Sequence, residues 1–374
     1  MSDEILNCDV AVVGAGLSGL ACAHLLREAG LNTIVLEAAD RVGGRIHSVT
    51  HSTTGVYVAD LGPTWVWPPY QPSVTAWLKR LNVDTFEQFE DGDGILDMDE
   101  NAPVQRQPLP GQYGIRRISG GPQALINRLH ASLAKDMLRT GHRATAIKAG
   151  GTALKITTNG PDIRSLTANR VVIAVPPRLA AQNIAWLGCL DHKVLTALTQ
   201  TPTWMGAQAK AVMLYEQPFW RAKGLSGRVA SRIGPLAEIH DHCSPDVKES
   251  ALFGFIGWPH SARQSHPSAL RDAIERQLVR CFSKEGSAYS ALHIEDWACN
   301  PNACSDLDLT QPPSHPELTP GILREAHYEG RLFFSVAETA MQSPGLIDGA
   351  LSVATDTAAR LIEGWPHPPN YGGK

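Results

Sequence analysis

Short apolar runs and a glycine-rich turn alternate through the first forty residues of the chain. Residues 9–13 form a short β-branched run, which is typical of a strand buried in a parallel sheet. After the turn, the Ala- and Leu-rich residues 20–29 predict a helix that ends at Gly30, and residues 32–37 predict the next strand. This order of strand, turn, helix and strand is that of a βαβ unit.

The rest of the chain has a less regular hydrophobic pattern, in which helices and strands can still be recognised. Helical patterns occupy residues 72–81, 123–133, 268–282 and 345–363. Strand patterns occupy residues 56–61, 152–158, 170–175, 209–214 and 332–337. Two segments that contain several prolines, residues 62–70 and 87–112, are predicted to be irregular.

Length and charge narrow the class of protein. The 374 residues suffice for more than one domain, and a composition of 43% hydrophobic and 19% charged residues suits a globular protein. A net charge of −4 without a basic tract gives the chain no general attraction to nucleic acid. Because no apolar run approaches the roughly 18 residues of a membrane-spanning helix, we expect no membrane anchor.

Cysteine usage and the first residues bear on the cellular compartment. The seven cysteines are odd in number, and no pair has the Cys-x-x-Cys spacing. We therefore expect reduced thiols rather than a disulfide framework or a metal site. Residues 1–8 are polar and acidic, unlike a secretory signal peptide. Together these features predict a cytoplasmic protein.

The turn after the first strand has the spacing Gly-x-Gly-x-x-Gly, at Gly14, Gly16 and Gly19. An ordinary turn can have this spacing, but here it follows a buried strand, opens a helix and precedes Glu37 at the end of the next strand. The first glycine permits the tight turn, the second lets backbone approach a pyrophosphate, and the third lets helix and strand pack. The helix N-terminus attracts phosphates, and Glu37 can accept hydrogen bonds from ribose hydroxyls while repelling a 2′-phosphate. We therefore predict a dinucleotide site.

A second glycine-rich segment runs from Arg41 through Gly43 and Gly44 to Arg45. Glycines between two arginines let a cationic side chain reach an anion while the backbone stays close to it. A basic surface turn would have the same composition. The position just after Glu37 favours instead a second clamp for the pyrophosphate of a longer dinucleotide.

Further segments resemble the flavin-containing monoamine oxidase family, whose relatives include polyamine oxidases, L-amino-acid oxidases and histone demethylases. Asp60-Leu61-Gly62, followed by Trp65, resembles the family's segment beneath the flavin ring. The similar segments keep the family's order from residue 9 to about residue 363. The later ones are residues 171–177, Lys210, residues 219–221, residues 338–340 and residues 349–350.

This resemblance implies an α/β fold in which a Rossmann-like FAD-binding domain of the glutathione-reductase type is joined to a discontinuous α+β substrate-binding domain. The FAD-binding domain would comprise residues 1–65, 136–180 and 321–374. The substrate-binding domain would comprise residues 66–135 and 181–320.

The resemblance also implies the cofactor FAD and the residues that hold it. A backbone group at Ala144 would contact adenine, and a helix N-terminus at Ile347 would stabilise negative charge at the flavin N1 and O2 atoms. We expect non-covalent binding rather than a bond to Cys304, because Ser305 follows this cysteine where the family has an aromatic residue. The residues expected to bind FAD are Gly14, Ala15, Gly16, Ser18, Gly19, Glu37, Ala38, Arg41, Gly43, Gly44, Arg45, Gly62, Pro63, Thr64, Trp65, Ala144, Glu338 and Ile347.

In this family the flavin carries out the chemistry, and the protein supplies orientation and electrostatics. A hydride would pass from the carbon next to the amine nitrogen to flavin N5, the imine would hydrolyse, and oxygen would reoxidise the flavin and form hydrogen peroxide. Lys210 resembles the lysine that holds a water near N5 and aids reoxidation, although a strand-edge lysine that reaches solvent would show the same pattern. Trp297 resembles a tryptophan that lines the flavin, although an ordinary core residue would also fit.

Two features depart from the family pattern. Ser305 and Leu346 stand where members often have two aromatic rings, which steer an amine by their π faces. The segment Ser335-Val336-Ala337-Glu338 stands where the family usually has a Gly-Thr pair before the glutamate. The prediction of FAD binding is not affected by these departures. The identity of the substrate is left undecided.

Three functions therefore remain open. The first is an FAD-dependent oxidase of a small-molecule amine, with oxygen or another electron acceptor. The second is a related oxidoreductase, a dehydrogenase or desaturase or an enzyme acting on an amino acid, whose carboxylate Arg116, Arg117 or Arg221 would bind. The third is a flavin-binding protein with little oxidase activity. Whether the chain forms a homodimer is also open.

Overall fold

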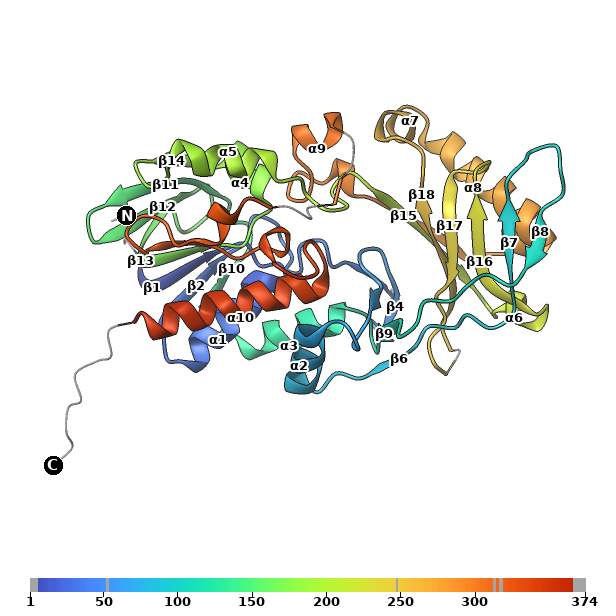
Figure 1. Cartoon of the computed structure of the whole chain (residues 1–374), viewed down its shortest axis with the longest axis horizontal. Helices are drawn as coiled ribbons and strands as arrows, with labels where there is room; N and C mark the ends of the chain where they lie inside the picture. The colour runs from blue at the N-terminus through green and yellow to red at the C-terminus, as the bar shows by residue number, and fades with distance from the viewer. Residues whose placement is uncertain (1–5, 52–53, 247, 312–313, 316–318, 366–374) are drawn as a thin grey trace. The chain divides into compact units, whose positions relative to one another are not determined.

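The chain forms two compact units in the computed structural model, which describes residues 6–51, 54–246, 248–311, 314–315 and 319–365 (Figure 1). The first unit comprises Met1–Gly44, Ile126–Trp204 and Ser314–Lys374. The second comprises Arg45–Leu125 and Met205–Pro313. The backbone therefore passes between the units four times along the sequence.

Within the described residues, the first unit is built on one eight-stranded sheet. Its central strand β1 (Leu6–Val13) pairs in parallel with its neighbours on both sides, as expected for a βαβ unit whose strands are covered on both faces. The order is β10 (Leu138–Arg139), β2 (Thr33–Leu36), β1, β13 (Ser165–Ile173), β12 (Ala153–Thr158), β11 (Ala144–Gly150) and β14 (Ala185–Leu187), with β20 (Leu332–Phe334) also paired to β13.

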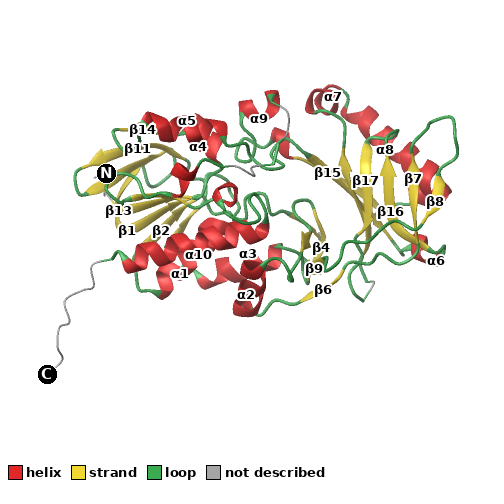
Figure 2. Cartoon of the chain, in the orientation of Figure 1, coloured by secondary structure: helices red, strands yellow, loops and turns green. Residues whose placement is uncertain are grey.

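Helices cover this sheet (Figure 2). Helix α1 (Leu17–Glu28) packs against helix α10 (Ile347–Glu363), although more than 300 residues separate them in sequence. Full burial of a leucine such as Leu20 or Leu351 stabilises the packed state by about 1.5–3 kcal/mol relative to exposure. The other helices of this unit are most of α3 (Gln123–Ser132), α4 (Pro177–Asn183) and α5 (His192–Gln200), with 3₁₀ turns η3 (Gly321–Arg324) and η4 (Ala337–Thr339).

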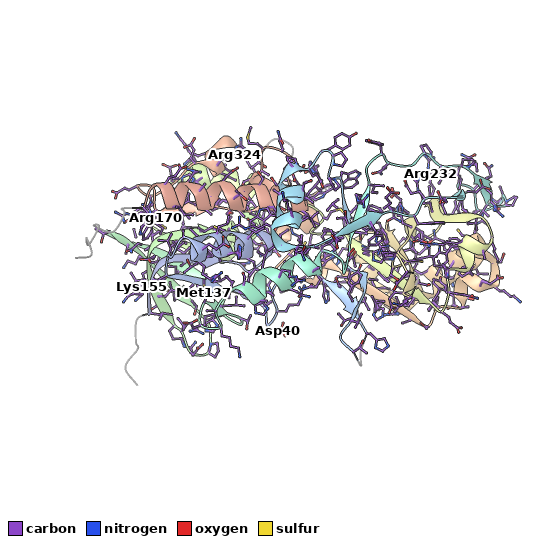
Figure 3. The ribbon with its side chains drawn as sticks, turned by 90° about the horizontal axis from the view of Figure 1, so that it is seen from below. Asp40, Met137, Lys155, Arg170, Arg232 and Arg324 are labelled. Carbon is purple, nitrogen blue, oxygen red and sulfur yellow. The ribbon has the colours of Figure 1, made fainter. Side chains whose placement is uncertain are left out.

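An arginine on β13 fastens the end of the long C-terminal helix to the sheet. Arg170, which Figure 3 labels, donates hydrogen bonds to the carbonyl oxygens of Gly330 (2.6 Å) and Gly364 (2.7 Å). Its guanidinium also lies 5.4 Å from the ring centroid of Trp365. These contacts fix the last turn of α10, where a cation also complements the helix dipole.

The second unit contains a seven-stranded sheet, mostly antiparallel, within the part of the chain that is described. Its order is β19 (Ala291–Asp296), β15 (Ala209–Tyr215), β18 (Ser250–Ile256), β17 (Leu236–Asp241), β16 (Leu225–Ser231), β7 (Asp93–Asp97) and β8 (Gln105–Gln107). Helix α8 (Pro267–Phe282) buries Leu270, Ile274 and Leu278 in the same core as the inward residues of this sheet.

Smaller elements complete the second unit. Strands β3 (Ser48–Thr50) and β4 (Tyr57–Asp60) form a pair, and β5 (Trp65–Val66), β9 (Arg116–Ile118) and β6 (Thr85–Glu87) form a three-stranded sheet. The remaining elements are α2 (Pro72–Leu81), α6 (Phe219–Ala222), α7 (His260–Ser265), α9 (Asp306–Thr310), and the 3₁₀ turns η1 (Ser283–Ser287) and η2 (Trp297–Cys299).

The predicted irregular segments were partly wrong. Residues 87–112 contain β7 and β8, and residues 62–70 contain the short strand β5. Strand β8 has the sequence Gln-Arg-Gln and is fully exposed at the sheet edge, so no alternation of apolar side chains announces it. The helices predicted at 72–81 and 268–282 and the strands predicted at 9–13 and 209–214 are confirmed.

The compact units divide the chain at other places than the expected domains. Residues 45–65 lie in the second unit, and residues 126–135 and 181–204 lie in the first. In the described part of the chain, no helix combines the length and the apolar composition that crossing a membrane requires.

Candidate cofactor and active site

The glycine turn between β1 and α1 is shaped by close backbone contacts in the first unit. Gly14 has a φ of +105°, and a Cβ there would lie 2.6 Å from the carbonyl oxygen of Ala174. A Cβ on Gly19 would overlap the carbonyl oxygen of Gly14, so α1 can lie this close to the turn only with glycine at that position. By contrast, no atom lies within 4 Å of where a Cβ on Gly16 would be.

This open face at Gly16 is where a pyrophosphate would fit. Gly16 is the N-cap of α1 and makes no side-chain cap, so the first-turn N–H groups keep their capacity for an anion. The Gly43 N–H donates to the Ala15 carbonyl oxygen at 2.8 Å, and Gly16 and Gly43 form a parallel bridge. The second glycine-rich segment therefore lies beside the first, as a double clamp requires.

Positive φ angles explain the glycine pair in this second segment. Gly43 has a φ of +106° and Gly44 a φ of +57°, in the region that favours glycine. Arg41 donates to the carbonyl oxygens of Val42 (3.2 Å) and Gly44 (2.9 Å) and so braces its own loop. Arg45, the second arginine of the predicted clamp, is the first residue of the second unit and is described with that unit.

Glu37 is fixed at the end of β2 by two backbone donors. Its Oε2 accepts the Ala15 N–H at 2.7 Å, and its Oε1 accepts the Ala39 N–H at 2.8 Å. Each carboxylate oxygen retains a further lone pair, which can accept a ribose hydroxyl. The Glu37 carbonyl oxygen accepts the His142 N–H at 2.7 Å, which brings Ala144 at the start of β11 toward the same end of the sheet. Ala38 lies between Glu37 and Ala39 in the same turn.

The C-terminal segment returns to α1. Ser18 donates to the Ser335 carbonyl oxygen at 2.8 Å, and the two hydroxyl oxygens lie 3.0 Å apart. The serine at 335, a departure from the expected pattern, thus pairs with a serine of the glycine turn. Glu338 is fully buried and its Oε1 accepts the Trp204 N–H at 3.1 Å, and Ile347 begins α10.

The first unit thus gathers most of the predicted FAD-binding residues around one turn. It offers an open glycine backbone, a helix N-terminus, a fixed carboxylate and a paired second loop. These are the groups that a dinucleotide needs, so the residues present fit FAD.

The predicted lysine is buried in the second unit. Lys210 on β15 is 3% exposed, and its Nζ donates to the Gly62 carbonyl oxygen at 3.0 Å and to the Thr64 hydroxyl. The Nζ also lies 4.0 Å from the ring centroid of Phe253 and 5.9 Å from that of Phe255. Burial lowers the pKa of Lys210 to about 7, against the attraction of Asp60. A lysine that reaches solvent from a strand edge is therefore excluded.

Trp297 lies near the same segment. Its indole N–H donates to the Leu61 carbonyl oxygen at 3.2 Å, and its ring meets that of His47 edge-on with centroids 6.4 Å apart. Gly62 packs so tightly on the Arg45 carbonyl that a side chain would overlap it. The second unit thus brings together Arg45, Gly62, Thr64, Lys210 and Trp297, and Pro63 lies between two of them in sequence.

Four polar side chains near Lys210, three of them buried and Tyr57 half-buried, form contacts that sequence reasoning did not identify. Asp60 was noted only as part of a motif, and Arg117 only as a binder of a substrate carboxylate. Tyr57 and His242 were not noted at all, because their separation of 185 residues gives no sequence signal for their contact. Arg117 instead donates to the Cys243 carbonyl oxygen at 2.7 Å.

Arg221, another candidate for a substrate carboxylate, is half-buried and also engaged. It forms two 2.8 Å hydrogen bonds with Asp241, and its guanidinium lies 3.9 Å from the ring centroid of Phe89. Arg116 bonds to the Thr85 side chain and backbone. A bidentate carboxylate pair of this kind leaves Arg221 little capacity for a second anion.

A small hollow of about 10 Å³, enough for about one water molecule, lies beside Trp65 in the second unit. Trp65 contacts His240 edge-on at 4.7 Å and donates its indole N–H to Gln88 at 2.9 Å. Arg228 lies 3.4 Å from Glu90 in an ion pair. The lining residues are Trp65, Gln88, Phe89, Glu90, Gln112, Ile115, Arg228 and His240.

The residues at the expected aromatic positions have structural roles. Ser305 is buried and caps α9 through Asp308, whose carboxylate lies 2.7 Å from the Ser305 hydroxyl. Leu346 is the N-cap residue of α10. Burial raises the pKa of the neighbouring Cys304 thiol to about 12, which leaves little thiolate for a covalent bond.

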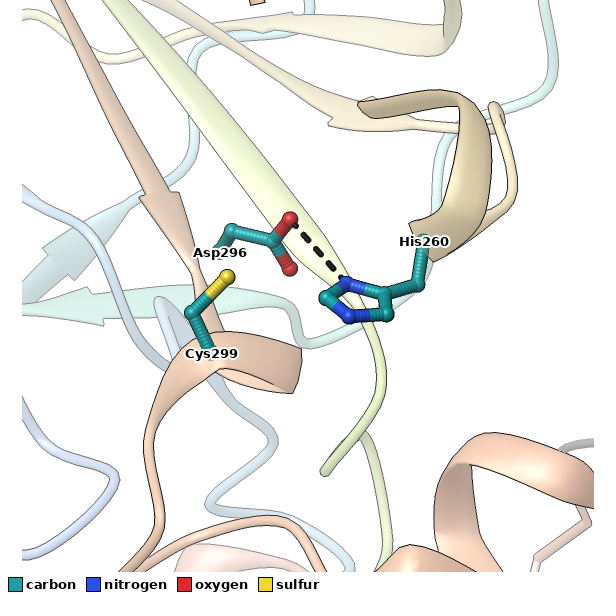
Figure 4. A group of neighbouring side chains, drawn as sticks. All are labelled: His260, Asp296 and Cys299. Atoms are coloured by element: carbon teal, nitrogen blue, oxygen red, sulfur yellow. Dashed lines mark ion pairs between the residues drawn. The ribbon is translucent and has the colours of Figure 1, made fainter. Parts of the chain in front are cut away.

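A cluster of possible metal ligands lies elsewhere in the second unit. His260 Nδ1, an Asp296 oxygen and Cys299 Sγ all lie within 4.8 Å of one another (Figure 4). However, Arg263 binds both oxygens of Asp296, at 2.8 and 2.7 Å. Because this guanidinium already neutralises the carboxylate, the cluster is best described as an ion pair flanked by a histidine and a thiol.

Comparison with known proteins bears on the whole chain. A sequence profile described as flavin containing amine oxidoreductase matches residues 17–113 and 105–362. Amine oxidase [flavin-containing] B of Sus scrofa is 26% identical, over 95% of this chain and 86% of that protein. The probable flavin-containing monoamine oxidase A of Dictyostelium discoideum is 23% identical, over 74% of this chain and 80% of that protein.

Solved structures resemble the chain in fold. A putrescine oxidase bound to putrescine has a TM-score of 0.78 at 21% identity and covers 96% of this chain and 100% of its own. Cyclohexylamine oxidase from Brevibacterium oxydans IH-35A has a TM-score of 0.80 at 18% identity, with coverage of 95% and 99%. At these identities the structures establish a shared α/β fold.

Proposed function

Because the chain belongs to the family of flavin-containing amine oxidoreductases, we propose that it is an FAD-dependent oxidase of small amines. The observation that carries this proposal is the presence of both halves of the required machinery. The first unit has a glycine turn open at Gly16, and the second has a buried lysine held by Gly62 and Thr64. We assign FAD to the first unit and the substrate to the second.

Bound FAD would supply a two-electron acceptor that takes a hydride from the carbon next to the amine nitrogen. The chain's own residues bind and orient it. The N–H groups at the start of α1 would hold the pyrophosphate, Glu37 would accept ribose hydroxyls, and the N-terminus of α10 at Ile347 would favour negative charge on the reduced ring. The binding is non-covalent, since the buried Cys304 thiol is a poor nucleophile.

Lys210 acts when oxygen is reduced. Its ammonium form stabilises the negative charge that develops on oxygen and donates one of the two protons that hydrogen peroxide carries. The Gly62 carbonyl and the Thr64 hydroxyl fix the position of Nζ and leave it able to bind water. Trp297 orients the segment that contains Gly62 through its bond to Leu61.

The proposal is tested with the purified full-length protein and a panel of amines. We expect flavin bleaching when an amine is added without oxygen, and hydrogen peroxide when oxygen is admitted. Bleaching without peroxide would show a dehydrogenase, and no bleaching with any amine or amino acid would overturn the proposal.

The role of Lys210 has its own test. Lys210→Met should keep the bound flavin and the rate of bleaching but reoxidise on the order of a hundredfold more slowly. Lys79→Met, at an exposed position on α2, is the matched control and should reoxidise at the unaltered rate. Equal rates for the two variants would remove Lys210 from this role.

An amino-acid substrate is the second candidate, because Arg228 beside Trp65 is partly exposed and its ion pair with Glu90, at 3.4 Å, could be replaced by one with a substrate carboxylate. Its guanidinium would bind the substrate carboxylate in exchange for Glu90. In that case Arg228→Gln should raise the KM of an amino acid roughly tenfold or more and leave that of the corresponding decarboxylated amine unchanged. An equal change for both substrates would exclude this candidate.

The finer features are also proposals. We further propose a cytoplasmic location, oxygen as the electron acceptor and a homodimeric state, which fractionation, oxygen consumption and sedimentation would test.

A further inference from the structure

Ionisable side chains are buried close to Lys210 in the second unit. The ring of Phe253 contacts both Lys210, with Nζ 4.0 Å from its centroid, and His242, with centroids 5.2 Å apart, and His242 in turn accepts the Asp60 backbone N–H. Asp60 at the end of β4 is 1% exposed, Arg117 on β9 is 3% exposed and His242, just after β17, is fully buried. Charges cost free energy when they are buried, so the sum of charges in this cluster determines which groups ionise.

Asp60 is held as an anion by the groups around it. Its carboxylate accepts hydrogen bonds from the hydroxyls of Ser48, at 3.3 Å, and Tyr57. The Tyr57 hydroxyl is also a hydrogen-bond partner of Arg117, which links the carboxylate to a permanent cation. Gly121 packs directly on Asp60 and Tyr57, and a side chain there would overlap both.

His242 adds no charge to the cluster. Its Nε2 lies 3.4 Å from the Asp60 carboxylate, a distance that would allow an ion pair. However, the same Nε2 accepts the Asp60 backbone N–H at 2.9 Å, so this nitrogen carries no proton. Burial and the charge of Arg117 also lower the pKa of His242 well below its ordinary value. The ring is therefore neutral.

Lys210 is left without a counter-ion of its own. In the described residues no carboxylate oxygen lies within 4.0 Å of its Nζ, which binds only a carbonyl and a hydroxyl and faces two phenylalanine rings. Arg117 and Asp60 already balance each other. A proton on Lys210 would therefore give the buried cluster a net charge of +1.

We propose that Asp60 and Arg117 are positioning residues that act through Lys210. Together, by opposite electrostatic effects, they determine whether the Lys210 side chain carries a proton. Asp60 favours the ammonium form and Arg117 favours the free amine. This inference rests on the proposed function, because the balance matters to the reaction only if Lys210 exchanges a proton during it.

The direction of the pKa shifts agrees with this charge balance. Burial lowers the pKa of Lys210 to about 7, with Asp60 raising it and Arg117 lowering it. Burial raises the pKa of Asp60 to about 6, against the cations Lys210 and Arg117. A lysine with this pKa gains and loses a proton near neutral pH, as a residue that relays one proton in each turnover must.

Other titratable groups lie on the strands next to Lys210, and each has a hydrogen-bond partner of its own. Glu295, the cross-strand neighbour of Lys210 on β19, pairs with His47 at 2.7 Å. His240 on β17 lies 3.1 Å from Glu238, and burial lowers its pKa, so it contributes little positive charge. Strand β18 presents Phe253 and Phe255 to the lysine, which do not titrate.

The experiment measures the titration of Lys210 in the full-length, FAD-loaded protein. Lysines are labelled with ¹³C at Cε, and the NMR signal of Lys210 is assigned by its loss in Lys210→Met. The chemical shift of this signal is measured against pH, and its midpoint is the pKa of Lys210. We expect Asp60→Asn to lower the midpoint by about one pH unit and Arg117→Gln to raise it by about the same amount. Arg116→Gln, which removes a neighbouring cation outside the cluster, should leave it unchanged.

Opposite shifts cannot come from a general loss of structure, which would move both variants the same way. Midpoints that move together, that do not move, or that move as far in Arg116→Gln as in Arg117→Gln would overturn the inference. Should Asp60→Asn fail to fold, Tyr57→Phe keeps the carboxylate but removes one donor, and should lower the midpoint by a smaller amount.

A second readout separates this inference from the proposed function. The pH midpoint of flavin reoxidation should follow the titration midpoint in each variant, and this dependence should vanish when Lys210→Met is added. If the titration shifts are opposite but the pH dependence of flavin reoxidation is the same with and without Lys210, the electrostatic inference holds. The role assigned to the lysine in reoxidation is then wrong.

Discussion

Lys210 illustrates what a single residue reveals in advance. A lysine within an apolar strand pattern costs free energy to bury, and this cost, together with the family resemblance, marked it as a candidate. Its partners Gly62 and Thr64 lie 148 and 146 residues away, and the neutralising pair of Asp60 and Arg117 comes from two other strands. The residue could be predicted from its local pattern, whereas its electrostatic environment depends on strand pairing that no local pattern encodes.

The pKa of Lys210 predicts how reoxidation depends on pH. Because burial moves the pKa from 10.5 to about 7, the ammonium form is lost as the pH rises through about 7 rather than through 10.5. We expect the rate of reaction of the reduced flavin with oxygen to fall across this range and to be flat in Lys210→Met. Stopped-flow absorbance from pH 6 to pH 9 measures this, and a rate that rises with pH would contradict it.

Cys304 gives a second prediction at the residue scale. With a thiol pKa near 12, it should form no bond to flavin, so all flavin should separate from the acid-denatured protein. Mass spectrometry of the intact chain checks this result. Cys304→Ser should retain as much flavin as the unaltered protein, and a chain mass increased by a flavin would contradict the non-covalent assignment.

The helices and strands differ in how clearly the local sequence pattern predicts them. The turn between β1 and α1 was predicted from its glycine spacing. The structure shows the reason for that spacing at Gly14 and Gly19, where a side chain would overlap neighbouring backbone atoms. Strand β7 was missed because its sequence, Asp-Gly-Ile-Leu-Asp, contains only two apolar residues and a glycine. It is a strand because β16 pairs with it, and such pairing overrides a weak local pattern.

The glycine turn allows binding and stability to be separated. In Gly19→Ala the added methyl would overlap the Gly14 carbonyl, so we expect the free energy of unfolding of the FAD-free protein to fall by about 1–3 kcal/mol. In Gly16→Ala the methyl enters open space, so that stability should stay the same. FAD affinity should nevertheless fall at least about tenfold, or ~1.4 kcal/mol, because the methyl occupies the approach of the pyrophosphate.

Thermal unfolding and flavin titration of the two variants measure these effects. Gly16→Ala serves as the control for stability and Gly19→Ala as the control for direct obstruction. Unaltered FAD affinity in Gly16→Ala would show that the cofactor does not approach this turn.

The whole molecule is a shorter version of its relatives. The alignment with the Sus scrofa protein spans 458 positions, more than the 374 residues of this chain, so the relative carries internal segments that this chain lacks. The family and the α/β fold could be predicted from motifs near both ends. The unit boundaries could not, because contacts rather than motifs decide that residues 45–65 belong with the second unit.

Cofactor binding should stabilise the molecule selectively. FAD at about 100 times its Kd should stabilise the folded state by about 2.7 kcal/mol and raise the Tm, whereas NADP should not, because Glu37 repels a 2′-phosphate. Differential scanning calorimetry of the flavin-free protein with each nucleotide tests this. An equal rise with both nucleotides would argue against a role for Glu37 in selection.

The four crossings between the units have a consequence for biosynthesis. All residues of the second unit have been translated by residue 313, whereas the first unit still lacks β20 and α10 at that point. Helix α1 therefore lacks its packing partner α10 until residues 347–363 have been translated. Until then the apolar face of α1 that packs against α10 is uncovered, and it is a segment that a chaperone would protect.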